Sequence, residues 1–179
     1  GGGGYAWGGA GTIFTRASNQ SSGQVVADNG GQAGTNTTWT STGTVDLTVR
    51  NGAVVSMPTS QTIGSLLVAS NGWLSLPANQ AQTVTGNAVV QAGGGIIADG
   101  TGNQAGVGTG AGRYYNSGTS GTIGGGGGYG GYGAAGGAPA GNSAYGGSPY
   151  GSVTAPVDLG SGGGSSYSPG LGGAGGGAI

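Results

Sequence analysis

Residues 49–57, VRNGAVVSM, place an Asn-Gly pair between two apolar runs, and residues 68–76, VASNGWLSL, repeat the arrangement. Asn-Gly between alternating apolar residues is a strong signal for a two-residue β-hairpin turn. A hairpin does not require its turn to recur at a fixed distance along the chain. The repeated stretch therefore has two interpretations: separate hairpins, or the corners of one repeated structural unit.

The spacing of the turns favours the repeated unit. Glycines in similar apolar contexts follow one another at intervals of 21, 22, 20 and 21 residues, a constant period that is typical of a solenoid. Asn and Gly tolerate positive φ, so such a corner can turn the chain from one sheet into the next in every coil. The predicted corner residues are Gly9, Asn29, Gly30, Asn51, Gly52, Asn71, Gly72 and Gly93.

Residues 12–100 have the composition of β-strands, rich in Val, Ile, Leu and Thr. Alternation at Val45, Leu47 and Val49 predicts one inward face, whereas the continuous runs at 66–68 and 88–90 suggest strands that are covered on both faces. No segment has a helical period. We expect an all-β, right-handed parallel β-helix of about five coils within a domain at 1–100, the handedness following from the crossover preference of parallel strands. A meander of hairpins is the alternative.

Residues 101–179 form a second region of Gly, Ser, Ala, Tyr and Pro. From Gly124 onward glycines recur every third residue, and Tyr129 and Tyr132 follow the same period in another row. Three residues per turn suits a polyglycine-II-like helix, which has no internal hydrogen bonds and needs partners outside itself. We expect this segment to pack on the solenoid or on a neighbouring subunit. A flexible low-complexity linker is the alternative.

The composition excludes several chemistries. The 179 residues include 51 Gly, 3 Lys+Arg and 4 Asp+Glu, with no His and no Cys. The chain therefore lacks the usual ligands for structural zinc and iron–sulfur clusters and the residues of Ser-His-Asp catalysis. The four Asp residues are dispersed along the sequence, so they form neither a calcium-binding repeat nor the pair of carboxylates that a glycosidase uses. We predict a protein that is not an enzyme and has no cofactor or metal.

Charge and hydropathy also limit the partners. Arg16, Arg50 and Arg113 make no basic stripe, so we expect no nucleic acid partner. No apolar run approaches the length of a membrane span. Only 4% of the residues are charged, against roughly 25% in ordinary soluble domains, and such a surface favours self-association. The chain starts GGGG without Met and ends GGAGGGAI, so we expect a processed subunit or a piece of something longer.

The order of these motifs resembles a family. GGAGTIFTR, VRNGAVVSM, GGGIIADGTG at 93–102, a Gly/Tyr tract and PVDLGSGGG at 156–164 look like one unit of the large glycine-rich tandem-repeat proteins of bacterial cell surfaces, which resemble parallel β-helix adhesins and autotransporter passengers. The resemblance covers nearly the whole chain. It implies a structural or adhesive role at the cell surface or outside the cell, with no catalytic residues to transfer.

The expected function is therefore mechanical. Copies of the chain, stacked or in tandem, would build an extracellular fibre, sheath or adhesin stalk, because open β-helix ends expose strand edges and apolar core. The alternative is a polysaccharide-binding adhesion module in which exposed tyrosines stack on sugars. A carbohydrate-active enzyme would rest on fold analogy alone. The candidate residues for glycan stacking or contacts between subunits are Tyr129, Tyr132, Tyr145 and Tyr150.

Overall fold

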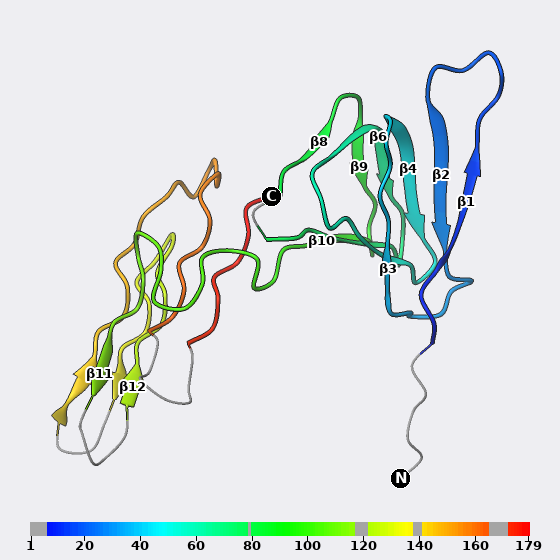
Figure 1. Cartoon of the computed structure of the whole chain (residues 1–179). Helices are drawn as coiled ribbons and strands as arrows, with labels where there is room; N and C mark the ends of the chain where they lie inside the picture. The colour runs from blue at the N-terminus through cyan, green and yellow to red at the C-terminus, as the bar shows by residue number, and fades with distance from the viewer. Residues whose placement is uncertain (1–6, 79, 117–121, 138–140, 165–171) are drawn as a thin grey trace, which may run out of the picture. The chain divides into compact units, whose positions relative to one another are not determined.

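The computed structural model describes residues 7–78, 80–116, 122–137, 141–164 and 172–179. The chain divides after Ile97 into two compact units, Gly1–Ile97 and Ala98–Ile179. The described residues form strands, turns and extended segments, without any α-helix. We call the first unit the solenoid and the second the glycine-rich unit (Figure 1).

The solenoid contains two sheets that alternate along the chain. The larger has the order β1-β2-β4-β6-β8, with β9 also paired to β6, and the smaller has the order β10-β7-β5-β3. The strands of the larger sheet are β1 (Gly11–Thr15), β2 (Gly23–Asp28), β4 (Val45–Arg50), β6 (Gln61–Val68), β8 (Gln82–Val84) and β9 (Ala88–Val90). Those of the smaller sheet are β3 (Asn36–Thr38), β5 (Val54–Ser56), β7 (Trp73–Ser75) and β10 (Gly95–Ile97).

Each coil contributes to both sheets. β2 and β3 belong to the first coil, β4 and β5 to the second, β6 and β7 to the third, and β8, β9 and β10 to the fourth. Successive coils pair in parallel, as in the register of Leu47 with Val25 and of Leu74 with Val55. The predicted β-solenoid is confirmed, with about four coils, and the meander of hairpins is wrong. The handedness of the coils stays a prediction.

The first strand departs from the expected repeat. β1 pairs antiparallel with β2, with Phe14 opposite Val25, so residues 11–28 form a hairpin and not a fifth coil. Only residues 16–22 connect the two strands. A connection this short allows an antiparallel return, whereas a parallel crossover needs about a dozen residues or more. The first strand of the larger sheet therefore runs against the others, after a parallel bridge between Trp7 and Gly34.

Inward side chains from both sheets fill the solenoid. β2 and β4 bury every second residue, which confirms the alternation at Val45, Leu47 and Val49. The largest fully buried side chains are Leu47, Met57, Ile63, Leu74, Val49, Val55 and Val68. Burial of each such side chain contributes about 1.5–3 kcal/mol relative to exposure. This core gives the solenoid its stability beyond the hydrogen bonds of the two sheets.

The continuous apolar runs at 66–68 and 88–90 do not both show the burial that the sequence predicts. In β6, Leu66 and Val68 are buried and Leu67 between them is half-buried. In β9, however, all three residues are exposed. The expectation that both runs are covered on two faces is therefore wrong for β9. Such a run marks an edge strand here, because within the described part of the chain β9 pairs only with β6.

The glycine-rich unit contains short antiparallel pairs and long extended segments. β11 (Tyr114–Asn116) pairs with β12 (Thr122–Gly124), and β13 (Gly136–Gly137) pairs with β14 (Ser143–Ala144). Backbone hydrogen bonds join distant segments elsewhere, such as those from Gly106 to Gly163 and from Gly175 to Asn103. Residues 138–140 and 165–171 of the predicted tract, including Ala138, lie outside the described residues.

The contacts of one segment, residues 124–128, repeat every third residue. The N–H groups of Gly125 and Gly128 donate to the segment of Arg113 and Gly110, whereas Gly126 between them donates to Ala134. A Cβ on Gly125 or Gly128 would likewise meet one neighbouring segment, at Tyr145 and Ser148, and one on Gly124 or Gly127 another, at Gly164 and Ser161. This period is the one that a polyglycine-II-like helix requires. That conformation itself stays a prediction.

Candidate functional site

The predicted corner residues from Asn29 to Gly93 lie between strands of the larger and the smaller sheet and form a ladder along the solenoid, whereas Gly9 precedes β1 and lies against Thr37. Asn51 and Asn71 have positive φ of 54° and 55°, and Gly30, Gly52 and Gly93 have positive φ of 62°, 83° and 80°. Successive corners are bonded to one another, because the N–H of Asn71 donates to the carbonyl oxygen of Gly93 at 2.8 Å. The repeated Asn-Gly pair thus serves the stacking of the coils.

Close packing explains the glycine at several of these positions, whereas a Cβ on Gly30 would meet nothing within 4 Å. A Cβ on Gly52 would lie 2.0 Å from the carbonyl oxygen of Gln32, and one on Gly72 would lie 2.3 Å from that of Val49. Gly9 also leaves little room, because its Cβ would lie 2.7 Å from Oγ1 of Thr37. A side chain at these positions would push neighbouring coils apart. The ladder is therefore structural in its geometry.

The ladder contains one polar cluster, built on Asp28. The N–H of Gly30 donates to Oδ1 of Asp28 at 2.9 Å, and Nε of Arg50 and Nδ2 of Asn51 donate to Oδ2 at 2.7 Å and 3.0 Å. These contacts lower the pKa of Asp28, first through the Gly30 N–H and then through Arg50 and Asn51. Asn29 lies beside the cluster and donates to the carbonyl oxygen of Gln32 at 2.7 Å. Both carboxylate oxygens of Asp28 are thus hydrogen-bonded within the fold.

The four predicted tyrosines fall into two classes. Tyr129 and Tyr150 pack against each other edge to face, with ring centroids 5.1 Å apart and an interplanar angle of 77°. Tyr132 and Tyr145 are 82% and 70% exposed. A sugar needs an uncovered ring face for stacking. Tyr132 and Tyr145 provide such a face, whereas the rings of Tyr129 and Tyr150 pack against each other within the unit.

The hydroxyl groups of the packed pair differ. Tyr150 donates to the carbonyl oxygen of Leu159 and accepts from Oγ of Ser161 at 2.9 Å. The buried Ser161 hydroxyl also accepts from the N–H of Gly110 at 2.9 Å, so it ties three segments together. The buried hydroxyl of Tyr129 has no hydrogen-bond partner in the described part of the chain.

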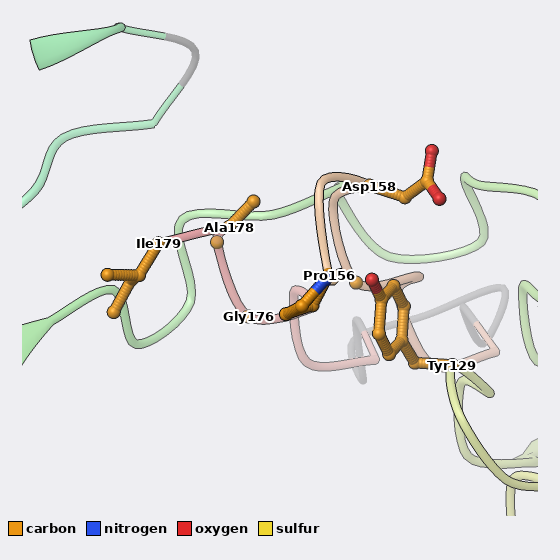
Figure 2. Close-up of a pocket in the computed structure, with 8 residues that line it drawn as sticks. Tyr129, Pro156, Asp158, Gly176, Ala178 and Ile179 are labelled. Carbon is orange, nitrogen blue, oxygen red and sulfur yellow. The ribbon is translucent and has the colours of Figure 1, made fainter. Parts of the chain in front are cut away.

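A pocket of about 380 Å³ lies beside Tyr129 (Figure 2). Its lining also includes Pro156, Asp158, Gly160 and residues 176–179, and it is mainly apolar. Asp158 supplies the one carboxylate side chain of this lining. A single carboxylate does not provide the pair that acid–base hydrolysis of a glycoside requires.

A second concave surface was not foreseen from the sequence. We call it the Arg113 groove; it has a volume of about 750 Å³. It is lined by Ala105, Gly106, Ala111, Gly112, Arg113, Tyr114, Tyr115 and Asn116. The sequence did contain a signal for this groove: Arg113 is the one cationic residue between positions 98 and 179, and it directly precedes two tyrosines. Arginine with exposed aromatic rings is a common composition of binding surfaces.

The described residues contain no group of three or more His, Cys, Asp or Glu that could hold a metal ion. Among these same residues, no helix has the length and apolar character needed to cross a membrane. Comparisons of the chain with protein-family models, with curated proteins and with solved structures found no match. Function must therefore be argued from the geometry of the two units.

Proposed function

We propose that this chain is a structural subunit, or one unit of a tandem array, in an extracellular or cell-surface fibre, sheath or adhesin stalk that assembles from copies of itself. The observation that carries the proposal is that both ends of the solenoid expose apolar side chains on edge strands. The resemblance to glycine-rich tandem-repeat surface proteins supports the same role. The proposal includes no catalytic step.

At the N-terminal end, β1 is an edge strand with all five residues exposed. Phe14 lies opposite the buried Val25, so its side chain belongs to the inner face of the sheet, yet it is 61% exposed. Ile13, on the opposite face, is exposed to the same extent. An exposed apolar edge strand is a template for pairing with another chain.

At the other end of the solenoid, the pairing partner of β9 among the described residues is β6, and that of β10 is β7. Val90 lies in register with the buried Val68 and therefore belongs to the inner face, but it is 47% exposed. Repeat proteins normally end in polar capping units. Neither edge strand, β1 or β9, contains a charged residue that would oppose pairing.

The test is electron microscopy of the untreated protein, combined with sedimentation at increasing concentration. We expect filaments, with an axial rise that is a multiple of about 4.8 Å, the spacing of paired strands. Phe14→Lys should abolish them by placing a charge at the stacking end. Val157→Lys is the matched control, because Val157 is exposed and lies in the glycine-rich unit, outside any strand. Dispersed particles at all concentrations would refute the proposal.

A second candidate function is polysaccharide binding through exposed tyrosines. The observation that favours it is the exposure of Tyr132 and Tyr145. Pull-down with insoluble cellulose and chitin tests it: Tyr132→Ala and Tyr145→Ala should weaken retention, whereas a scaffold without sugar binding would lose nothing.

A further inference from the structure

We propose that the Arg113 groove binds a saccharide that carries a carboxylate group, such as a uronic acid oligomer. This inference goes beyond self-assembly and is independent of it. It narrows the second candidate function to an acidic ligand and to a site other than Tyr132 and Tyr145. Three features support it: the backbone hydrogen bonds that hold the groove, the Arg113 guanidinium, which has no partner among the described residues, and the exposed ring of Tyr114.

The backbone of the groove is held in place by neighbouring segments. The N–H of Arg113 donates to the carbonyl oxygen of Tyr145 at 2.9 Å, and its own carbonyl oxygen accepts from Gly125 at 2.8 Å. On the other wall, the N–H of Gly106 donates to Gly163 at 2.7 Å. The groove is thus formed before any ligand arrives, which reduces the ordering cost of binding.

The guanidinium of Arg113 has no partner within the described residues. Arg113 is exposed, and the one ion pair found among those residues joins Arg50 to Asp28, in the solenoid. No carboxylate side chain belongs to the lining of the groove. An arginine presents a planar fork of donors that fits a carboxylate with two parallel hydrogen bonds. Arg113 is therefore free to select an anionic group.

Tyr114, which lines the same groove, supplies an uncovered aromatic surface. It is 61% exposed and lies directly opposite Gly124 across the β11–β12 pair. Because glycine has no side chain, nothing from the partner strand covers the ring at that position. Aromatic side chains offer large apolar contact area at low entropic cost, which suits the C–H faces of a sugar ring. An arginine and an open aromatic ring in the lining of one groove thus match a carboxylated sugar.

Other anionic ligands fit the groove less well. A nucleic acid presents a row of phosphates and requires several cations, whereas the glycine-rich unit has Arg113 alone. The groove volume of about 750 Å³ falls within the range of roughly 300–1,000 Å³ of small-ligand sites. A short acidic oligosaccharide satisfies the size, the single charge and the aromatic face together.

The experiment titrates trigalacturonate into isotopically labelled protein and follows the amide and Arg113 side-chain resonances by NMR. Fully methyl-esterified trigalacturonate is the matched probe, because it keeps the sugar rings and removes the negative charges. We expect the acid to shift resonances of residues 105–116 and to bind at least tenfold more tightly than the ester. Arg113→Gln should reduce the affinity at least tenfold, and Tyr114→Ala should also weaken binding.

Two control variants separate this site from other surfaces. Arg16→Gln removes an exposed arginine of the solenoid, and Tyr132→Ala removes the most exposed of the described tyrosines; both should bind trigalacturonate as the unchanged chain does. The titration is repeated with Phe14→Lys, so that failure of assembly and failure of binding are distinguished. Equal affinity for acid and ester, no shifts with millimolar acid, or unchanged binding by Arg113→Gln would overturn the proposal. It would also be overturned if Arg113→Gln altered only self-association, since the groove would then be a contact between copies.

Discussion

The solenoid and the glycine-rich unit exclude water from their interiors with different atoms. In the solenoid, Leu47 of the second coil and Ile63 and Leu74 of the third fill the space between the two sheets. In the glycine-rich unit, the buried residues with side chains are Ala98, Ala144 and Ser161 among those described, and the remaining buried positions are glycines. Repeated backbone pairing stabilises each unit internally. Among the described residues, the solenoid alone adds a core of large apolar side chains.

Glycine therefore has two different roles in one chain. In the solenoid it is required at corners, where Gly52 and Gly72 meet the backbone of the neighbouring coil. In the other unit it is required along whole segments, because carbonyl groups of adjacent segments lie where a Cβ would be. Substitutions can test this difference. All three tryptophans lie in the solenoid, so tryptophan fluorescence reports the unfolding of that unit.

The largest effect is expected from Gly147→Ala. A Cβ at Gly147 would lie 1.7 Å from the carbonyl oxygen of Gly110, and neither backbone can yield without losing hydrogen bonds. We expect a loss above about 4 kcal/mol, enough to unfold the glycine-rich unit. Amide hydrogen exchange of residues 98–179 measures it. Gly131→Ala, where nothing lies within 4 Å, is the control and should change stability little; equal effects of both variants would contradict a backbone-packed interior.

Leu47→Ala should have the next largest effect, confined to the solenoid. The side chain is 1% exposed in the middle coils, and its removal leaves a cavity. Such substitutions cost about 2–5 kcal/mol. Urea unfolding followed by tryptophan fluorescence measures the loss. Val157→Ala, at an exposed site of the other unit, should stay within about 0.5 kcal/mol of the unchanged chain.

A smaller effect is expected from the two packed tyrosines, which form a matched pair. Tyr150→Phe removes the hydrogen bonds with Leu159 and Ser161 and should cost about 1–3 kcal/mol in the glycine-rich unit. Tyr129→Phe removes a buried hydroxyl that has no partner in the described residues, so it should be neutral or stabilising. Thermal melts recorded by tyrosine near-ultraviolet circular dichroism compare them. A larger loss for Tyr129→Phe would show that its hydroxyl is paired.

The smallest effect concerns pH and the solenoid corner. The pKa of Asp28 is lowered in the folded state by the Gly30 N–H and by Arg50 and Asn51. Its stabilising contribution is therefore present above the unfolded pKa of about 3.9 and is lost as the pH falls through the lower folded value. Urea midpoints between pH 6 and pH 2 should fall, and Asp28→Asn should flatten that dependence. An unchanged slope in the variant would assign the effect to other carboxylates.

The repeat of the solenoid could be predicted because its physical cause is local. An Asn-Gly corner at positions such as 51–52 and 71–72 needs positive φ, and the period of the corners reports the stacking of coils. The reversed strand β1 could not be read from composition, since its residues have the same apolar character as a parallel strand. Only the length of the connection at 16–22 distinguishes the two, and it carries no distinctive motif.

The candidate site was predicted less well. A three-residue period shows which side chains share a row, but it does not show which members of that row meet a neighbouring segment. Tyr129 and Tyr132 share the same row in the sequence, yet Tyr129 is packed and Tyr132 is exposed. The Arg113 groove depends on backbone segments far apart in the chain, such as those of Gly106 and Gly163. No local pattern encodes that proximity.

The scarcity of buried side chains in the glycine-rich unit has a thermal consequence. Exposure of apolar surface raises the heat capacity on unfolding, and exposure of peptide groups lowers it. A unit whose interior is mostly backbone therefore unfolds with a heat-capacity change below the usual 12–15 cal/mol/K per residue. Its stability should decline almost linearly on warming, without the broad maximum near room temperature that the solenoid shares with ordinary domains. Cooling would strengthen this half of the protein where a hydrophobic core begins to weaken.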